Sequence, residues 1–308
     1  MPSLDASFVR QATGGRLMGQ APDEAFAGVS TDSRGVAPGQ LFVALAGPNF
    51  DGHDYVQKAL EAGAAGAVVR QGFSLPQMPE ACLFEVPDTL AALGDMAAAW
   101  RREHSALVAA ITGSNGKTST KEMLAGILEQ RHRVLKTRGN LNNLIGLPLT
   151  VLRMNDGHTA CVLEMGMNAP GEIARLTQIA APEVGLITNV GPAHLGPMGS
   201  MKAVALAKTE LFRGLDNTAT AVVNLDDPQL SPWARKLDCR VLTFGASPKA
   251  QVRCADVSAL GSRLALTLRL PGEEPLRVRL AAPGRHNALN ATAAAAAAHA
   301  LGQGPEAI

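Results

Sequence analysis

The residue types best suited to chemistry stand together in the run Thr-Gly-Ser-Asn-Gly-Lys-Thr at residues 112–118. Gly113 and Gly116 allow the backbone to bend so that its N–H groups point into one concavity, and Lys117 can reach the outer phosphates of a nucleotide. Thr118 can offer its hydroxyl to Mg²⁺. This run predicts a phosphate-binding loop. The residues expected to contact the nucleotide are Gly113, Ser114, Asn115, Gly116, Lys117, Thr118 and Ser119.

Two elements must position this loop. Residues 107–111 form a short apolar run that predicts a buried parallel strand, and residues 123–128 carry apolar side chains at helical spacing. A helix that begins after the loop adds the partial positive charge of its N-terminus. The spacing departs from the common G-x-x-x-x-G-K-S/T pattern because Ile111 stands where the first glycine belongs. The alternative is a glycine turn with Lys117 as a surface charge, and the flanking strand and helix disfavour it.

The composition indicates a folded protein with large buried cores. The 308 residues leave room for about two domains, and 46% of them are hydrophobic while 18% are charged. The net charge is +1 with Lys and Arg scattered along the chain, so no basic face for nucleic acid is expected. The four cysteines have no metal-binding spacing, which predicts reduced, mostly buried thiols in a cytoplasmic protein. The alanine-rich stretch after Arg285 predicts a closely packed helix rather than a membrane span.

The pattern of apolar segments predicts an α/β protein of two domains. Residues 1–86 form a small unit rich in glycine turns, and residues 87–308 form a second unit that opens with a connecting helix over 87–105. The second unit alternates strands with helices, which predicts a mostly parallel sheet covered on both faces. Residues 251–280 change to a pattern typical of an antiparallel hairpin. The expected strands cover residues 160–163, 184–188, 219–223 and 240–244, and the expected helices cover 171–179, 201–211 and 228–236.

Three titratable residues of the second unit are candidates for chemistry. Glu164 ends an apolar strand at the edge where the sheet also presents the phosphate loop, so it can bind Mg²⁺; alternatively, it caps a helix near Gly171. His194 follows the next strand on the same edge, although a loop histidine taken alone is more often a surface residue. Lys208 lies in a helical pattern, where a solvated lysine is the usual outcome.

Several polar runs leave a structural and a functional interpretation open. Residues 139–143 (Gly-Asn-Leu-Asn-Asn) suit a turn or a polar wall for a hydrogen-bonding substrate. Asn287 can cap the last helix or contact adenine, and Asn290 lies three residues on along the same side. Residues 30–34 and 47–54 flank an apolar strand, where such polar residues are often turn formers.

Taken together, these segments resemble the Mur ligase family, the cytoplasmic ATP-dependent amide ligases of peptidoglycan precursor synthesis. The resemblance runs nearly from end to end of the chain, and the combination of motifs is far more specific than any one of them. The matching runs, in order, are Ser-Thr-Asp-Ser-Arg (30–34), Phe-Val-Ala (42–44), Asp-Gly-His (51–53), the loop at 112–118, Gly-Asn-Leu-Asn-Asn (139–143), Leu-Glu-Met-Gly (163–166), residues 189–194, Ala-Lys (207–208) and Gly-Arg-His-Asn (284–287).

The resemblance implies three domains: a UDP-substrate domain (residues 1–86), a central P-loop ATPase domain (87–308) and a C-terminal Rossmann-like domain. Because the chain stops at Ile308, we expect the third domain to be absent, and we expect residues 1–308 to bind the UDP-linked substrate without completing ligation. The runs at 139–143 and 168–173 most resemble the member that adds D-alanyl-D-alanine to UDP-N-acetylmuramoyl-tripeptide. The alternatives are the diaminopimelate- or lysine-adding member, a P-loop kinase or nucleotidase, and a non-catalytic nucleotide or UDP-sugar binder.

By resemblance, the terminal carboxylate of the UDP-linked tripeptide attacks the γ-phosphate of ATP, and the incoming amine then displaces phosphate from the acyl phosphate. The protein supplies charge neutralisation and in-line positioning. Carbamylation of Lys208 would turn a cation that repels Mg²⁺ into an anionic oxygen ligand. We also expect a monomer. For ATP, the resemblance implies Lys117 at the β- and γ-phosphates and Asn287 and Asn290 at adenine. For Mg²⁺, it implies Thr118 and Glu164 as ligands of one ion, and His194 and carbamylated Lys208 as ligands of a second; Lys117, His194 and Lys208 are the implied catalytic residues. For the UDP-linked substrate, it implies Thr31, Ser33 and Asn49 at uridine, and Asn142, Asn143 and Asn168 at the rest of the molecule.

Overall fold

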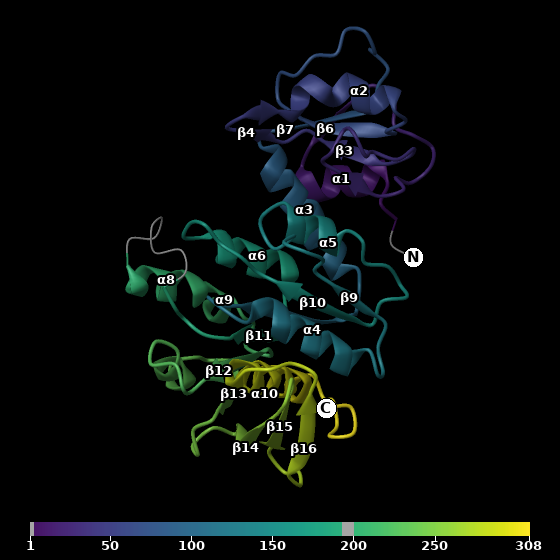
Figure 1. The fold of residues 1–308 in the computed structure, drawn as a ribbon. Helices are drawn as coiled ribbons and strands as arrows, with labels where there is room; N and C mark the ends of the chain where they lie inside the picture. Colours follow the sequence, from purple (N-terminus) through teal and green to yellow (C-terminus); the bar gives the residue numbers. More distant parts are fainter. Residues whose placement is uncertain (1–2, 193–199) are drawn as a thin grey trace. The chain divides into compact units, whose positions relative to one another are not determined.

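The computed structural model describes residues 3–192 and 200–308, so His194 lies outside the described residues. The chain forms two compact units (Figure 1). The first unit contains residues 1–104 and 144–156, and the second contains residues 105–143 and 157–308.

The units divide at His104, whereas the sequence suggests a domain boundary at residue 86. Helix α3 (Thr89–Arg102) belongs to the first unit because it packs against α1 (Ala6–Thr13) and α5 (Gly146–Val151). Its apolar side chains at helical spacing, which the sequence shows, therefore face the first unit's own helices. Trp100 illustrates this packing, since its ring contacts Phe8 of α1 edge to face.

A five-stranded sheet organises the first unit, with the strand order β1-β7-β6-β3-β2. Strand β1 pairs antiparallel with β7, and the other neighbours run parallel. Phe42, Val56 and Val69 belong to its apolar core. The elements are β1 (Arg16–Met18), β2 (Val29–Ser30), β3 (Leu41–Val43), β4 (Ala46–Gly47), β5 (Phe50–Asp51), η1 (Gly52–Tyr55), α2 (Val56–Glu61), β6 (Gly66–Arg70) and β7 (Leu83–Val86).

The Asp-Gly-His run at residues 51–53 has a structural role in this unit. His53 is buried, and its Nε2 accepts a hydrogen bond of 2.9 Å from the backbone N–H of Arg70, so its proton lies on Nδ1 and is donated to Asp51 at 2.5 Å. Arg70 also pairs with Asp51 at 2.7 Å. The hydrogen bond from the backbone N–H of His53, together with those from the His53 and Arg70 side chains, lowers the pKa of Asp51 to about 2. This network holds the β4–β5 hairpin that carries Asn49.

The second unit is built on a nine-stranded sheet in the order β16-β15-β14-β13-β12-β11-β8-β10-β9. The strands from β14 to β9 are parallel neighbours, and β14, β15 and β16 pair antiparallel. The strands are β8 (Leu107–Thr112), β9 (Val134–Lys136), β10 (Ala160–Glu164), β11 (Val184–Ile187), β12 (Thr220–Asn224), β13 (Arg240–Gly245), β14 (Val252–Leu260), β15 (Arg263–Arg269) and β16 (Leu276–Leu280). The helices are α4 (Lys117–Leu128), α6 (Glu172–Ala180), α8 (Met201–Lys208), α9 (Glu210–Arg213), α10 (Arg285–Ala300) and the 3-10 helix η2 (Ser231–Arg235).

Helices cover both faces of the parallel strands, as the sequence predicts. On one face, α4 and α10 pack against each other and over a core that includes Ile111 and Leu186 (Figure 1). Gly185, whose neighbours in β11 face that core, faces the opposite side, where a Cβ at its position would lie 3.3 Å from the side chain of Leu211 of α9. The alanines of α10 are buried along most of the helix, and their small side chains allow the close approach to α4.

The structure differs from the expected elements in three places. The expected helix over 228–236 is only the 3-10 helix η2, which begins at a Ser-Pro step. The expected helix over 201–211 is two helices, α8 and α9, separated at Thr209. The expected hairpin over 251–280 contains three strands. In the described residues, no helix is both long enough and apolar enough to span a bilayer.

Candidate active site

The phosphate-loop run forms a tight turn between β8 and α4. Gly113 and Gly116 have φ angles of +150° and +80°, a region that favours glycine. A Cβ on Gly113 would lie 1.9 Å from Oγ1 of Thr188, and a Cβ on Gly116 would lie 2.3 Å from Oδ1 of Asn290. Both glycines are therefore needed for conformation and for space, and the helix starts at the next residue, Lys117.

The end of the neighbouring strand β11 supports this loop. The backbone N–H groups of Ser114 and Asn115 donate to the carbonyl and side-chain oxygens of Asn189, at 2.9 and 3.0 Å. Thr188 donates its hydroxyl proton to the carbonyl of Asn115 at 2.6 Å. Two loop N–H groups are thus used within the protein rather than pointing into the concavity. Asn115 and Ser119 are exposed, and Ser119 lies in the first turn of α4.

Two lysines converge on one carbonyl of the loop. The ammonium groups of Lys117 and Lys208 each donate to the backbone oxygen of Gly113 at 3.0 Å, although Lys208 is 95 residues away in sequence. Only 2% of Lys208 is exposed, so it is not the solvated lysine that its helical pattern suggests. Burial, followed by the neighbouring Lys117 ammonium, lowers the pKa of Lys208 to about 8. Burial also lowers the pKa of Lys117, while the Glu164 carboxylate opposes that shift.

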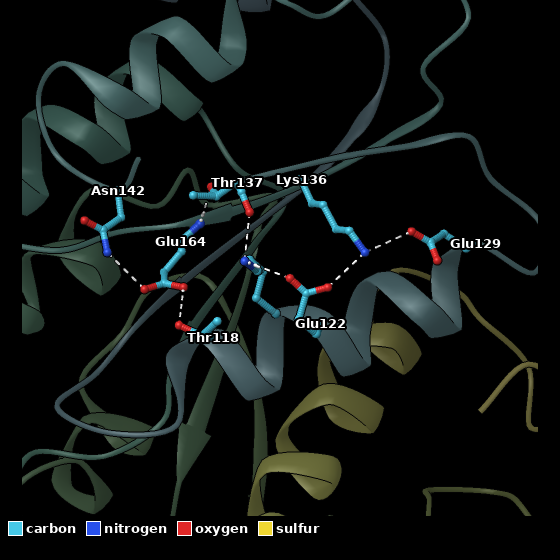
Figure 2. A network of polar contacts seen from close by, with 8 residues as sticks. Thr118, Glu122, Glu129, Lys136, Thr137, Asn142 and Glu164 are labelled. Carbon is cyan, nitrogen blue, oxygen red and sulfur yellow. Dashed lines mark hydrogen bonds and ion pairs between the residues drawn. The ribbon is translucent and has the colours of Figure 1, made fainter. Parts of the chain in front are cut away.

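Glu164 faces the first turn of α4 and lies at the centre of a polar network (Figure 2). Its Oε2 accepts a hydrogen bond of 2.9 Å from the hydroxyl of Thr118, and its Oε1 accepts one of 3.0 Å from the amide of Asn142. Glu164 does not cap a helix near Gly171, because the N–H groups at the start of α6 donate to Glu210 instead, from Gly171 at 2.8 Å and from Ala174 at 3.0 Å. Two hard oxygen donors, the Thr118 hydroxyl and the Glu164 carboxylate, therefore meet beside Lys117, and this donor set fits the ligand preference of Mg²⁺.

A buried lysine that the sequence pattern did not single out completes this network. Lys121 is 1% exposed, and its ammonium donates to the carbonyl of Thr137 at 2.8 Å and pairs with Glu122 at 2.9 Å. The hydroxyl of Thr137 in turn accepts a hydrogen bond from the backbone N–H of Glu164 at 3.0 Å. Lys136 extends the chain of contacts from Glu122 towards the end of α4 (Figure 2). The signal in the sequence is that Lys121 lies four residues after Lys117, on the same side of the helix.

A cavity of about 380 Å³ opens beside the phosphate loop. Asn290 lines this cavity, whereas Asn287 does not: the amide of Asn287 donates to the carbonyl of Pro283 at 2.7 Å, and its oxygen accepts from Asn290 at 3.1 Å. Phe244 and His286 also line the cavity, but no sequence pattern singled them out, because they come from β13 and the start of α10. The lining residues are Asn115, Gly116, Thr188, Asn189, Asn224, Phe244, His286, Leu289, Asn290 and Ala293.

The remaining predicted substrate residues lie in two groups. In the first unit, Thr31 and Ser33 directly follow β2, and Asn49 is exposed in the turn of the β4–β5 hairpin. In the second unit, Asn143 follows Asn142 and is exposed. The backbone N–H of Asn168, also exposed, donates to Glu172 at 2.6 Å before α6. Across residues 3–192 and 200–308, no three or more His, Cys, Asp or Glu side chains group in a way that could hold a metal ion.

This arrangement of parallel sheet, phosphate loop and converging lysines belongs to a known class. A family model of the Mur ligase middle domain matches residues 111–298, and a model described as the Mur ligase family, catalytic domain, matches residues 25–101. The chain therefore belongs to the Mur ligase family.

Individual relatives narrow the similarity. The chain is 40% identical over 280 residues to the UDP-N-acetylmuramoyl-tripeptide–D-alanyl-D-alanine ligase of Bacillus subtilis (strain 168), covering 91% of this chain and 60% of that protein. A crystal structure of MurF from Acinetobacter baumannii superposes with a TM-score of 0.92 at 35% identity, covering 100% of this chain and 67% of the other. MurF ligase from Thermotoga maritima, solved in complex with ADP, gives a TM-score of 0.81 at 31% identity over 90% of this chain and 63% of the other. The chain thus spans about two thirds or less of the length of these relatives.

Proposed function

We propose that this chain carries two parts of an ATP-dependent amide ligase that joins D-alanyl-D-alanine to UDP-N-acetylmuramoyl-tripeptide in the cytoplasm. The observation that carries the proposal is the convergence of Lys117 and Lys208 on the carbonyl of Gly113, beside the Thr118–Glu164 pair. A half-buried and a buried cation, neither of which forms an ion pair with a carboxylate in the described part of the chain, suit a ligand rich in phosphate oxygens. The Bacillus subtilis relative, which bears the name of that ligase, supports the choice of substrates.

In the proposed reaction, the residues of the loop bind and orient ATP. Lys117 holds the β- and γ-phosphates and stabilises the charge that develops as the γ-phosphoryl group moves to the substrate carboxylate. The N-terminus of α4 adds its partial positive charge, and the loop residues Gly113 to Ser119 would contact ATP. The cavity lined by Asn290 suits adenine, which agrees with the ADP bound in the Thermotoga maritima relative. Asn287 would act there by orienting Asn290 through their hydrogen bond.

The chain also offers ligands for Mg²⁺. Thr118 and Glu164 would hold one ion, and His194 with a carbamylated Lys208 would hold a second; bound Mg²⁺ neutralises phosphate charge. The pKa of about 8 favours carbamylation of Lys208, since about one in ten of its side chains is then neutral at pH 7 and able to react with CO₂. A carbamate would also remove the repulsion between Lys208 and Lys117.

The substrate residues complete the proposal. Thr31, Ser33 and Asn49 would contact the uridine end, because they follow strands of the first unit where the chain turns. Asn142 and Asn143 would contact the phosphate or sugar region, and Asn168 would contact another part of the substrate. In this assignment the amide of Asn142 has two uses, since it already donates to Glu164.

The test is a coupled assay in the whole protein. Phosphate release should require ATP, UDP-N-acetylmuramoyl-tripeptide and D-alanyl-D-alanine together, and mass spectrometry should find the amide product. ADP formation without the amine would indicate another activity instead: a kinase if the phosphoryl group stays on an acceptor, or a nucleotidase if free phosphate is released. Calorimetry on residues 1–308 with the tripeptide and the dipeptide substrate distinguishes this ligase from the diaminopimelate- or lysine-adding member, which should prefer the dipeptide. Binding without turnover in the whole protein would leave only a nucleotide or UDP-sugar binder.

A further inference from the structure

The antiparallel edge of the second unit, formed by β14, β15 and β16, buries only one of its faces. Leu264, Leu266 and Leu268 of β15 are buried in a cluster with Ala288 and Ala295 of α10. Figure 1 shows α10 running along this part of the sheet. Because side chains alternate along a strand, the residues between these leucines lie on the other face.

That other face gathers arginines from all three strands. In β15 it carries Arg263 and Arg269 at its ends, with Ala265 and Thr267 between them. Directly opposed residues of antiparallel strands share a face. The pairs Arg253–Arg269, Arg277–Thr267 and Arg279–Ala265 therefore add three more arginines. We call this surface the arginine face; its members are Arg253, Arg263, Arg269, Arg277 and Arg279.

The arginine face is not neutralised by the chain around it. In the described part of the chain, none of its five guanidinium groups forms an ion pair, and four of the five arginines are exposed. The acidic residues of the segment are Asp256, at the irregularity of β14, and Glu273 and Glu274, in the β15–β16 connection. The face is about 20 Å long and about 10 Å wide, from the rise per residue and the strand spacing. The whole chain has a net charge of only +1, whereas this one surface brings five arginines together.

We propose that the arginine face docks the protein reversibly onto a membrane that contains anionic phospholipids. Guanidinium groups bind phosphate oxygens in a bidentate fashion, and five of them in one sheet surface match a plane of headgroups. Between the arginines lie only small residues such as Ala265 and Thr267, with no aromatic ring on which a base could stack. This composition favours a lipid surface over a single-stranded nucleic acid. Without an apolar anchor, the attachment is electrostatic and weakens with salt.

The test is cosedimentation of residues 1–308 with vesicles. We expect binding to vesicles of equal parts phosphatidylglycerol and phosphatidylcholine at low salt, about 50 mM, and its loss at about 500 mM. Vesicles of phosphatidylcholine alone should not bind. The double variant Arg277→Ala/Arg279→Ala should bind about 10- to 30-fold more weakly, since each arginine near an anionic surface contributes about fivefold. Arg277→Lys/Arg279→Lys should retain most of the binding.

A matched control removes two charges from elsewhere in the same unit. Arg235→Ala/Lys236→Ala alters exposed cations at η2 and should change vesicle binding less than twofold. Equal binding by the two alanine double variants, or no binding of the unmodified chain at low salt, overturns the proposal. Tighter binding to double-stranded DNA than to vesicles at matched phosphate concentration also overturns it. Circular dichroism of each variant establishes that these surface changes leave the fold intact.

Discussion

Two groups of lysines lie at the first turns of α4, and they differ in how their charge is compensated. In the first group, the buried Lys121 contacts the carboxylate of Glu122 and the carbonyl of Thr137, so its charge is paired within the protein. In the second group, the half-buried Lys117 and the buried Lys208 both contact the carbonyl of Gly113. In the described part of the chain, neither of these two ammonium groups has a carboxylate within ion-pair distance.

The difference separates a structural cation from two functional ones. Burying a charge costs free energy unless a partner compensates, and Glu122 supplies that partner for Lys121. The cost remains at Lys117 and Lys208, where the lowered pKa values express it. A bound phosphate or a carbamate would supply the missing anion. Lys121 and Lys208 are therefore buried to a similar degree, but only Lys121 has a charged partner. Five substitutions, at Lys117, Lys208, Lys121 and Glu129, test this distinction.

The largest effect is expected from Lys117→Ala. It should reduce phosphoryl transfer by more than about a thousandfold, because the charge is needed where negative charge develops in the transition state. ATP affinity should fall by roughly 1.5–3 kcal/mol while the thermal midpoint stays unchanged. Steady-state kinetics and calorimetry in the whole protein measure both. Turnover equal to that of the unmodified protein would falsify the assignment of Lys117.

Lys208→Ala should abolish activity if Lys208 acts as a carbamate. Small carboxylates at high concentration should then restore part of the rate by filling the vacated space, whereas chloride at the same ionic strength should not. Removing bicarbonate should also depress the unmodified enzyme. A plain ammonium at Lys208 in mass spectra and density, under bicarbonate and with full activity, would contradict this prediction.

The charge of Lys208 should also appear in the pH dependence of stability. Its pKa is about 8 in the folded chain and 10.5 as the usual value, so in this interval the unfolded chain binds more protons. The free energy of unfolding contributed by this site therefore rises with pH, by roughly 3 kcal/mol at most. Lys208→Met removes the titrating group, so this variant should not show this rise in the free energy of unfolding. The measurement is the difference between the two proteins in chemical denaturation from about pH 7 to pH 10.5, in bicarbonate-free buffer. Parallel pH profiles would show that Lys208 is not destabilised by burial.

Lys121→Met should lower stability rather than turnover. The substitution leaves the carbonyl of Thr137 without its buried donor, which costs about 1–3 kcal/mol. Lys202→Met, at an exposed position of α8, is the matched control and should change stability by less than about 0.5 kcal/mol. Urea denaturation gives both values. A large loss of turnover at unchanged stability would show that Lys121 acts on the ligand, as Lys117 and Lys208 are proposed to do.

The smallest effect is expected from Glu129→Gln. Glu129 pairs with Lys136 at 3.2 Å on a partly exposed surface, where an ion pair contributes about 0–1 kcal/mol and is screened by salt. Lys136 also keeps its partner Glu122. The thermal midpoint should therefore stay within about 1–2 °C of the unmodified protein's, because a few tenths of a kcal/mol shifts it little. A shift of several degrees would show that the network in Figure 2 acts as one unit out to the end of α4.

Local patterns predicted most of the second unit's sheet. The strands over 160–163, 184–188, 219–223 and 240–244 agree with the structure within about one residue at each end, because a buried strand requires a continuous apolar run. Strand β9, with three residues, was missed because so short a segment carries no periodicity. The prediction of a helix over 228–236 was wrong, because the residues of this segment also allow a 3-10 helix, and tertiary packing decides between an α-helix and a 3-10 helix.

The sequence by itself determined the phosphate loop, because its glycines, Lys117 and Thr118 act through neighbours in the chain. Only the tertiary structure decided the partners of the distant residues. Lys208 reaches Gly113 across 95 residues, and Glu164 reaches Thr118 across 46, because strand order brings their elements together. The arginine face depends on the register of three strands, and one step of slippage would turn its side chains to the other side. Scattered arginines in the sequence therefore become one charged surface only when the sheet has formed.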